Sequence, residues 1–135
     1  MNANINQEVI RMKITAINPA IISAFADEII AFYEKNFGFR VIHKGNLIST
    51  ANPLETVCVL ENEAGLRLDV VRLDSAKSAA HGLRINVDDF DAGLALYEAE
   101  GFSVMCGPVA TETSKRVLLN KRDGAPVLLM QHLKK

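Results

Sequence analysis

The pattern of hydrophobic and polar positions changes its period along the chain and does so in the same order twice. Apolar residues recur at helical spacing in residues 24–37 and 88–100, which predicts two helices. The other apolar segments read as strands, namely residues 9–23, 38–45, 55–62, 65–72, 82–87, 101–109, 114–121 and 125–132. Each half of the chain therefore reads as strand, helix, strand, strand, strand.

Residues typical of helix ends support these two helices. Asp27 falls in the first turn of the first helix, and Asp88 and Asp89 open the second, where the helix dipole favours negative charge. Gly38 and Gly101 follow the helices at the position where glycine commonly adopts the left-handed conformation.

Local sequence repeats accompany the repeated pattern. The dipeptide Tyr-Glu occurs at 33–34 and at 97–98, and Gly-Phe occurs at 38–39 and at 101–102. Repetition at a nearly fixed interval indicates a duplicated structural unit. The alternative is a ferredoxin-like domain, whose strand–helix–strand pattern also repeats, but that fold has too few strands for residues 55–62 and 114–121. We therefore predict a duplicated unit of five elements.

Composition and charge narrow the class of protein. The chain has 135 residues, which suits one globular domain. Its net charge of −1 shows no excess of basic residues of the kind that binds nucleic acid. We expect no membrane span, because no segment approaches the roughly 20 apolar residues required, and the N-terminus lacks the pattern of a signal peptide. Cys58 and Cys106 are far apart and are expected to be free thiols, which predicts a cytoplasmic protein.

Two segments carry a resemblance to a known family. The motif FYEKxxGFxV at 32–41 and the segment NVDDFDAGLALYEAEGF at 86–102 resemble the vicinal oxygen chelate superfamily, over roughly residues 10 to 132. That superfamily includes glyoxalase I, bleomycin-resistance proteins, fosfomycin-resistance enzymes and extradiol dioxygenases. The resemblance implies an α+β fold in which two tandem βαβββ modules form one eight-stranded, cup-shaped sheet.

The resemblance also implies the organisation of the chain. Residues 1–135 would form a single glyoxalase-like domain, with module one at about 10–73 and module two at about 81–133. Many members of the superfamily pair as homodimers, sometimes with modules exchanged between chains, so a homodimer is expected.

Metal-dependent members of this superfamily hold a metal in the cup with a His or Gln from the first strand of each module and a Glu from the last. Matching these positions to the chain gives Asn18, Asp69, Gly82 and Leu128. Gly82 and Leu128 offer no donor atom, and Asp69 is the one carboxylate, whereas such metals require three or four imidazole or carboxylate ligands. We therefore expect no metal site and no cofactor.

The three histidines are not expected to replace the missing ligands. His81 should point away from the cup because strand side chains alternate. His132 shares a face with Leu128 but lies further along its strand, and His43 is expected on the face of Val41. We therefore interpret all three histidines as surface or structural residues.

The same alternation predicts which side chains line the cup. The predicted ligand-binding residues are Asn18, Arg40, Arg67, Asp69, Arg84, Leu128 and Met130. Arginine binds carboxylate or phosphate and stacks on flat rings, so the ligand is expected to be a small anionic or aromatic molecule. As an alternative, Asp69 pairs with Arg67 or Arg84 and the charges neutralise each other without a ligand.

Three functional hypotheses follow. The first is a metal-independent small-molecule-binding protein resembling the bleomycin-resistance branch. Pro19, which follows Asn18, resembles the proline found at that place in the branch. The chain departs from the branch in having few aromatic residues. The second is a metal-dependent glyoxalase-like lyase, isomerase or dioxygenase with an altered ligand set that includes Asp69. The third is a non-catalytic interaction domain whose cup is filled by its own side chains. No nucleophilic arrangement is visible, since no histidine is placed to activate Cys58 or Cys106.

Overall fold

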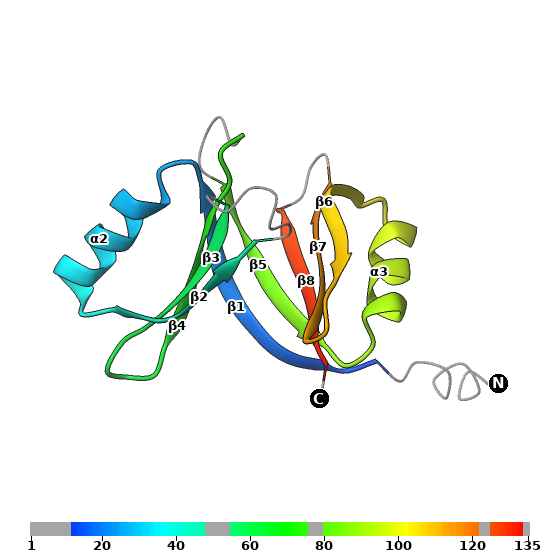
Figure 1. The fold of residues 1–135 in the computed structure, drawn as a ribbon, viewed down its shortest axis with the longest axis horizontal. Coiled ribbons are helices and arrows are strands. Elements are labelled where there is room, and N and C mark those ends of the chain that lie inside the picture. Colours follow the sequence, from blue (N-terminus) through cyan, green and yellow to red (C-terminus); the bar gives the residue numbers. More distant parts are fainter. Residues whose placement is uncertain (1–11, 48–54, 76–79, 122–124, 134–135) are drawn as a thin grey trace.

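The computed structural model describes residues 12–47, 55–75, 80–121 and 125–133. They form an eight-stranded sheet with two helices (Figure 1). Module one contributes β1 (Ile14–Ser23), α2 (Ala26–Phe37), β2 (Arg40–Asn46), β3 (Thr56–Glu61) and β4 (Arg67–Arg72). Module two contributes β5 (Ala80–Val87), α3 (Phe90–Ala99), β6 (Ser103–Ala110), β7 (Ser114–Asn120) and β8 (Val127–His132). The order of elements that the hydrophobic pattern predicts is confirmed.

The strands lie in the order β2-β3-β4-β1-β5-β8-β7-β6, so the sheet has one half from each module. β1 pairs in parallel with β4, β5 pairs in parallel with β8, and the antiparallel pair β1–β5 joins the halves. The sheet curls into a cup, with α2 and α3 packed on the outer face of their own halves (Figure 1). The predicted eight-stranded cup is confirmed.

The helix ends follow the signals in the sequence. Gly38 ends α2 in the left-handed conformation with φ 69°, and its amide donates to the carbonyl of Tyr33. The side chain of Asp89 accepts a hydrogen bond from the amide of Ala92 at 3.1 Å and so caps the start of α3. Both helices are therefore fixed relative to the strands that follow them.

Apolar side chains form three clusters, two beneath the helices and one inside the cup. The cluster inside the cup comprises Ile22, Leu47, Val57, Val71, Leu73, Leu118, Leu128 and Met130. These side chains come from both modules and alternate along their strands with residues that face α2 or α3. The cup is thus filled by its own side chains at one end.

The first part of the predicted strand 9–23, up to residue 11, lies outside the described residues. Asp123 and Gly124, whose residue types are typical of a turn between the strands predicted at 114–121 and 125–132, lie outside them as well. Neither described helix is long and apolar enough to cross a membrane.

Candidate ligand-binding site

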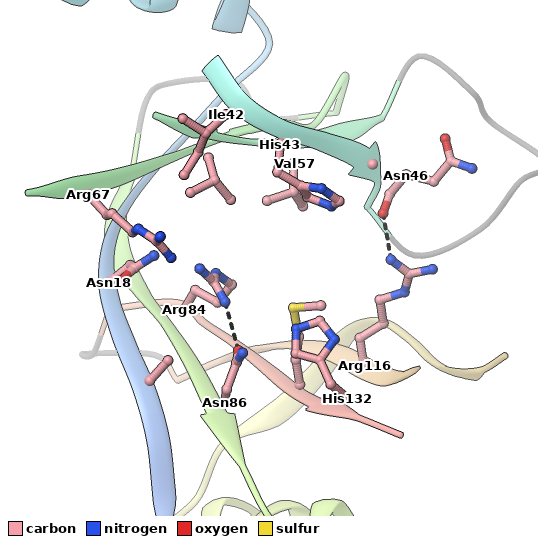
Figure 2. A pocket seen from close by; sticks show the side chains of 14 residues that line it. Asn18, Ile42, His43, Asn46, Val57, Arg67, Arg84, Asn86, Arg116 and His132 are labelled. Carbon is pink, nitrogen blue, oxygen red and sulfur yellow. Dashed lines mark hydrogen bonds between the residues drawn. The ribbon is translucent and has the colours of Figure 1, made fainter. Parts of the chain in front are cut away.

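A pocket of about 400 Å³ opens in the cup beside the apolar cluster, which contributes Val57 and Met130 to its wall (Figure 2). Its lining residues are Ala16, Asn18, Ile42, His43, Gly45, Asn46, Val57, Val59, Arg67, Arg84, Asn86, Arg116, Met130 and His132. The described lining therefore combines aliphatic side chains with three arginines and contains no carboxylate.

The floor of the pocket is a buried polar network around Asp69. This carboxylate is fully buried and accepts hydrogen bonds from Asn18 Nδ2 at 2.9 Å and from Nε and Nη2 of Arg84. Arg84 also donates from Nη1 to Asn86 Oδ1 at 2.8 Å (Figure 2). Of the two pairings expected for Asp69, the structure shows the one with Arg84.

Strand register brings the network together. β1 lies between β4 and β5, so that Ala20 pairs with Asp69 on one side and Asn18 pairs with Arg84 on the other. Because side chains two residues apart share a face, Asn18, Arg84 and Asn86 all point into the cup. The charges of Asp69 and Arg84 compensate each other within the protein.

Arg67 also lines the pocket, but its Nε donates to the Glu61 carboxylate at 3.1 Å, so it has a partner of its own. Met130 lines the pocket as well. Leu128 faces the cup, but it packs in the apolar cluster with 1% of its surface exposed and does not reach the pocket. Arg40 is exposed at the start of β2 and lies outside the pocket lining.

Arg116 is a pocket residue that the sequence reasoning missed. It lies opposite Met130 in the β7–β8 pairing, and its Nη1 donates to the backbone oxygen of Asn46 at 2.9 Å (Figure 2). This hydrogen bond joins β2 of module one to β7 of module two across the cup. Its Nε is buried and has no hydrogen-bond partner among the described residues. Alternation from Leu118 on the same strand was the signal that could have placed it.

Two histidines line the pocket. His132 shares the cup face with Met130, as the alternation predicts. The expectation that His43 lies on the face of Val41 is wrong: the β2–β3 register shifts between these two residues, and His43 faces the pocket beside Ile42. An irregularity of this kind reverses the faces of the residues that follow it.

The four positions matched to metal ligands do not fit a divalent metal. Both oxygens of Asp69 already accept hydrogen bonds from Arg84 or Asn18. Gly82 has no room for a side chain, because a Cβ there would lie 2.0 Å from the backbone oxygen of Pro126. Within the described part of the chain, no group of three or more His, Cys, Asp or Glu residues could hold a metal ion, and His81 is exposed outside the pocket.

The cysteines lie outside the pocket lining. Cys58 packs under α2 and Cys106 packs beside the apolar cluster, and both are free. Burial raises the pKa of the Cys58 thiol and of the Cys106 thiol above the ordinary value. Both therefore stay protonated at neutral pH, when a thiol is a poor nucleophile.

Comparison with known proteins supports the fold. No protein-family model and no curated protein matches the chain. A methylmalonyl-CoA epimerase from Streptomyces coelicolor, solved in complex with 2-nitronate-propionyl-CoA, is 19% identical with a TM-score of 0.61, covering 90% of this chain and 100% of that one. Methylmalonyl-CoA epimerase from Mycobacterium tuberculosis is 17% identical with a TM-score of 0.59, covering 90% of each chain.

A member of the glyoxalase/bleomycin resistance protein/dioxygenase superfamily from Vibrio splendidus 12B01 is also similar. It is 13% identical with a TM-score of 0.55, covering 90% of this chain and 100% of that one. At these identities the likeness shows a common fold, and it is the fold that the resemblance to the vicinal oxygen chelate superfamily predicts.

Proposed function

We propose that the protein binds a small molecule with an apolar body and a negatively charged group in the pocket of the cup, without a metal ion. The observation that carries this proposal is the lining of the pocket, in which aliphatic side chains and three arginines surround about 400 Å³ and the described lining residues include no carboxylate. Small-molecule sites typically have a few hundred Å³ of apolar space with a small number of converging polar groups.

The Asp69–Arg84 ion pair supports binding without a metal. Arg84 supplies the positive charge next to Asp69, so a divalent cation would have to displace a guanidinium and would be repelled by it. Gly82 and Leu128 contribute no donor atom. The metal-dependent lyase, isomerase or dioxygenase hypothesis is less well supported for these reasons.

The remaining space in the cup argues against a cup filled by its own side chains. The apolar cluster occupies one end, and the pocket lies beside it. The aromatic rings in the described lining are those of His43 and His132, which favours an anionic ligand over one held by aromatic stacking. Methylmalonyl-CoA epimerases were solved with 2-nitronate-propionyl-CoA and with methylmalonyl-CoA, so acyl esters of CoA belong among the compounds to test.

A homodimer in the cytoplasm is part of the proposal. Ile17 of β1 and Leu83 of β5 are 55% and 37% exposed on the outer face of the middle strands, between the helices, and apolar surface of this kind supports self-association. The free thiols support a reducing compartment. Light scattering coupled to gel filtration measures the mass of the particle, and a monomer at all concentrations would exclude the dimer.

The proposal is tested by a thermal-shift screen of carboxylic acids, aromatic acids and acyl-CoA esters, with and without EDTA, followed by calorimetric titration of the compounds that stabilise the protein. Ile42→Trp should fill the pocket and weaken binding at least about tenfold, because Ile42 lines it and is 39% exposed. Val41→Trp is the matched control, since Val41 is 38% exposed and lies outside the lining.

Metal content of the purified protein is measured in parallel. We expect no stoichiometric metal and the same stabilisation by ligand in the presence of EDTA. Stoichiometric metal whose removal abolishes ligand binding would contradict the proposal and favour a metal-dependent enzyme. Equal loss of binding in the two tryptophan variants would place the ligand outside the pocket.

A further inference from the structure

The three arginines of the pocket differ in how much of each guanidinium is free to bind a ligand. Arg84 donates from Nε and Nη2 to buried Asp69 and from Nη1 to Asn86, so each of its nitrogens already has a partner. Arg116 donates from Nη1 to a backbone oxygen, and the rest of its guanidinium faces away from the other lining residues (Figure 2). Arg67 is therefore the arginine to consider as a ligand-binding group.

The guanidinium of Arg67 has one nitrogen with a partner and a free edge. Nε donates to the Glu61 carboxylate at 3.1 Å, and Nη1 and Nη2 form no hydrogen bond with the described residues. The side chain comes from β4, is 51% exposed and lines the pocket. Figure 2 shows its guanidinium directed into the pocket. The edge formed by Nη1 and Nη2 is thus available to a ligand.

The charges at the pocket leave one positive charge for a ligand to compensate. Three arginines line the pocket, and two carboxylates, those of Asp69 and Glu61, form ion pairs with two of them. A monoanion matches the remaining charge. A planar carboxylate also accepts two parallel N–H bonds from one edge of a guanidinium. A carboxylate therefore suits the free edge of Arg67 in both charge and shape.

An aliphatic wall leads away from Arg67 along β3. Arg67 lies opposite Glu61 in the β3–β4 pairing, and Val59 and Val57 come two and four residues earlier on β3. Both valines line the pocket, and Val57 also belongs to the apolar cluster inside the cup. A ligand with its carboxylate at Arg67 can thus lay an unbranched aliphatic chain along this wall toward the cluster.

We propose that Arg67 is the anion-binding residue of the pocket, and that it holds the carboxylate of an unbranched aliphatic acid through Nη1 and Nη2. The chain of the acid lies along Val59 and then Val57. This inference rests on the proposed function, that the pocket binds a small molecule.

The test is an NMR titration of the full-length protein that follows its valine methyl groups. The probes are hexanoate, butanoate and hexanamide, the last of which matches hexanoate but is neutral. We expect hexanoate to shift the methyl groups of Val57 and Val59 saturably and hexanamide to bind at least about tenfold more weakly, because it lacks the charge. Butanoate should bind about fourfold more weakly for each methylene that it lacks.

Nuclear Overhauser contacts in the hexanoate complex report the direction of the chain. The terminal methyl group of hexanoate should contact Val57, and the methylene next to the carboxylate should contact Val59. The reverse order would overturn the proposed orientation of the ligand.

Variants of Arg67 test its role directly. Arg67→Gln should weaken hexanoate binding at least about tenfold and leave hexanamide binding nearly unchanged, which a general loss of structure would not do. Arg67→Lys should recover part of the hexanoate affinity, because the charge is kept while the fork is lost. Arg40→Gln is the control outside the pocket and should bind as the native protein does. Amide spectra of each variant establish that it is folded.

The outcomes separate this inference from the proposed function. Saturable shifts at Val57 and Val59 with the same hexanoate affinity in Arg67→Gln would overturn the role of Arg67 and leave the proposed function standing. Equal affinity of the native protein for hexanoate and hexanamide would overturn the carboxylate assignment. The absence of any shift at the pocket would overturn this inference, and if the screen also yields no ligand it would overturn the proposed function as well.

Discussion

Replacing Arg84 by methionine would leave a fully buried carboxylate without its cationic partner. The side chains of Arg84 and Asp69 are 9% and 0% exposed, and Arg84 provides two of the three hydrogen bonds that Asp69 accepts. Removing one member of a buried ion pair typically costs about 3–5 kcal/mol, because the remaining charge loses its compensation. We expect Arg84→Met to lower the free energy of unfolding by about this amount.

The double variant separates the charge from the packing. Asp69→Asn keeps the size of the side chain and an oxygen for Asn18, and it removes the buried negative charge. Combined with Arg84→Met it leaves neither charge in the floor of the pocket. We expect the double variant to be at least about 2 kcal/mol more stable than Arg84→Met alone, because contacting residues couple strongly.

Urea unfolding followed by circular dichroism measures these differences, provided that the slope with denaturant stays the same among the variants. Arg67→Met is the control: its ion pair with Glu61 is 51% exposed on the arginine side, so its loss should cost less than about 1 kcal/mol. A cost below about 1 kcal/mol for Arg84→Met, or a double variant no more stable than that single variant, would refute the reasoning.

Two further predictions concern packing and titration. Gly82→Ala should destabilise the protein by about 1–3 kcal/mol in the same urea assay, because the new Cβ would meet Pro126 O at 2.0 Å, whereas Gly45→Ala should be nearly neutral with its nearest contact at 3.6 Å. The raised pKa of Cys58 means that the folded protein keeps a proton that the unfolded chain loses above about pH 8.5. The free energy of unfolding should therefore fall as the pH rises above that value, and Cys58→Ala should lessen the fall; an unchanged slope would contradict the assignment.

The fold and the central part of the site follow from local patterns. A helix and a strand differ in hydrophobic period, so the duplicated order of elements is legible in the sequence and agrees with the structure. Alternation along a strand also places Asn18, Arg84 and Asp69 on one face. These three residues belong to regular strands in the middle of the sheet, where the pairing of β4, β1 and β5 continues without a shift beside them.

The edge of the site could not be predicted in the same way. The face of the sheet on which His43 lies depends on a register shift in the β2–β3 pairing, and no residue type in β2 predicts that shift. The contact of Arg116 with Asn46 joins residues 70 apart in the sequence and depends on how far the two halves of the sheet curl toward each other. The position of Arg40 outside the pocket likewise depends on the path of an edge strand.

Gly82 stands at one of the positions matched to metal ligands of the superfamily, and its surroundings leave no room for a metal-ligating side chain. Leu83 N donates to Pro126 O at 3.1 Å, so the carbonyl that would clash with a side chain at Gly82 is part of the β5–β8 pairing. A histidine there would have to push β8 away from β5, and it would still face the guanidinium of Arg84 two residues further along the same face. Introducing a metal ligand at this position therefore requires at least two coupled changes, in backbone spacing and in charge. The close approach of β8 and the Asp69–Arg84 pair therefore both disfavour a metal ligand at this place in the floor of the cup.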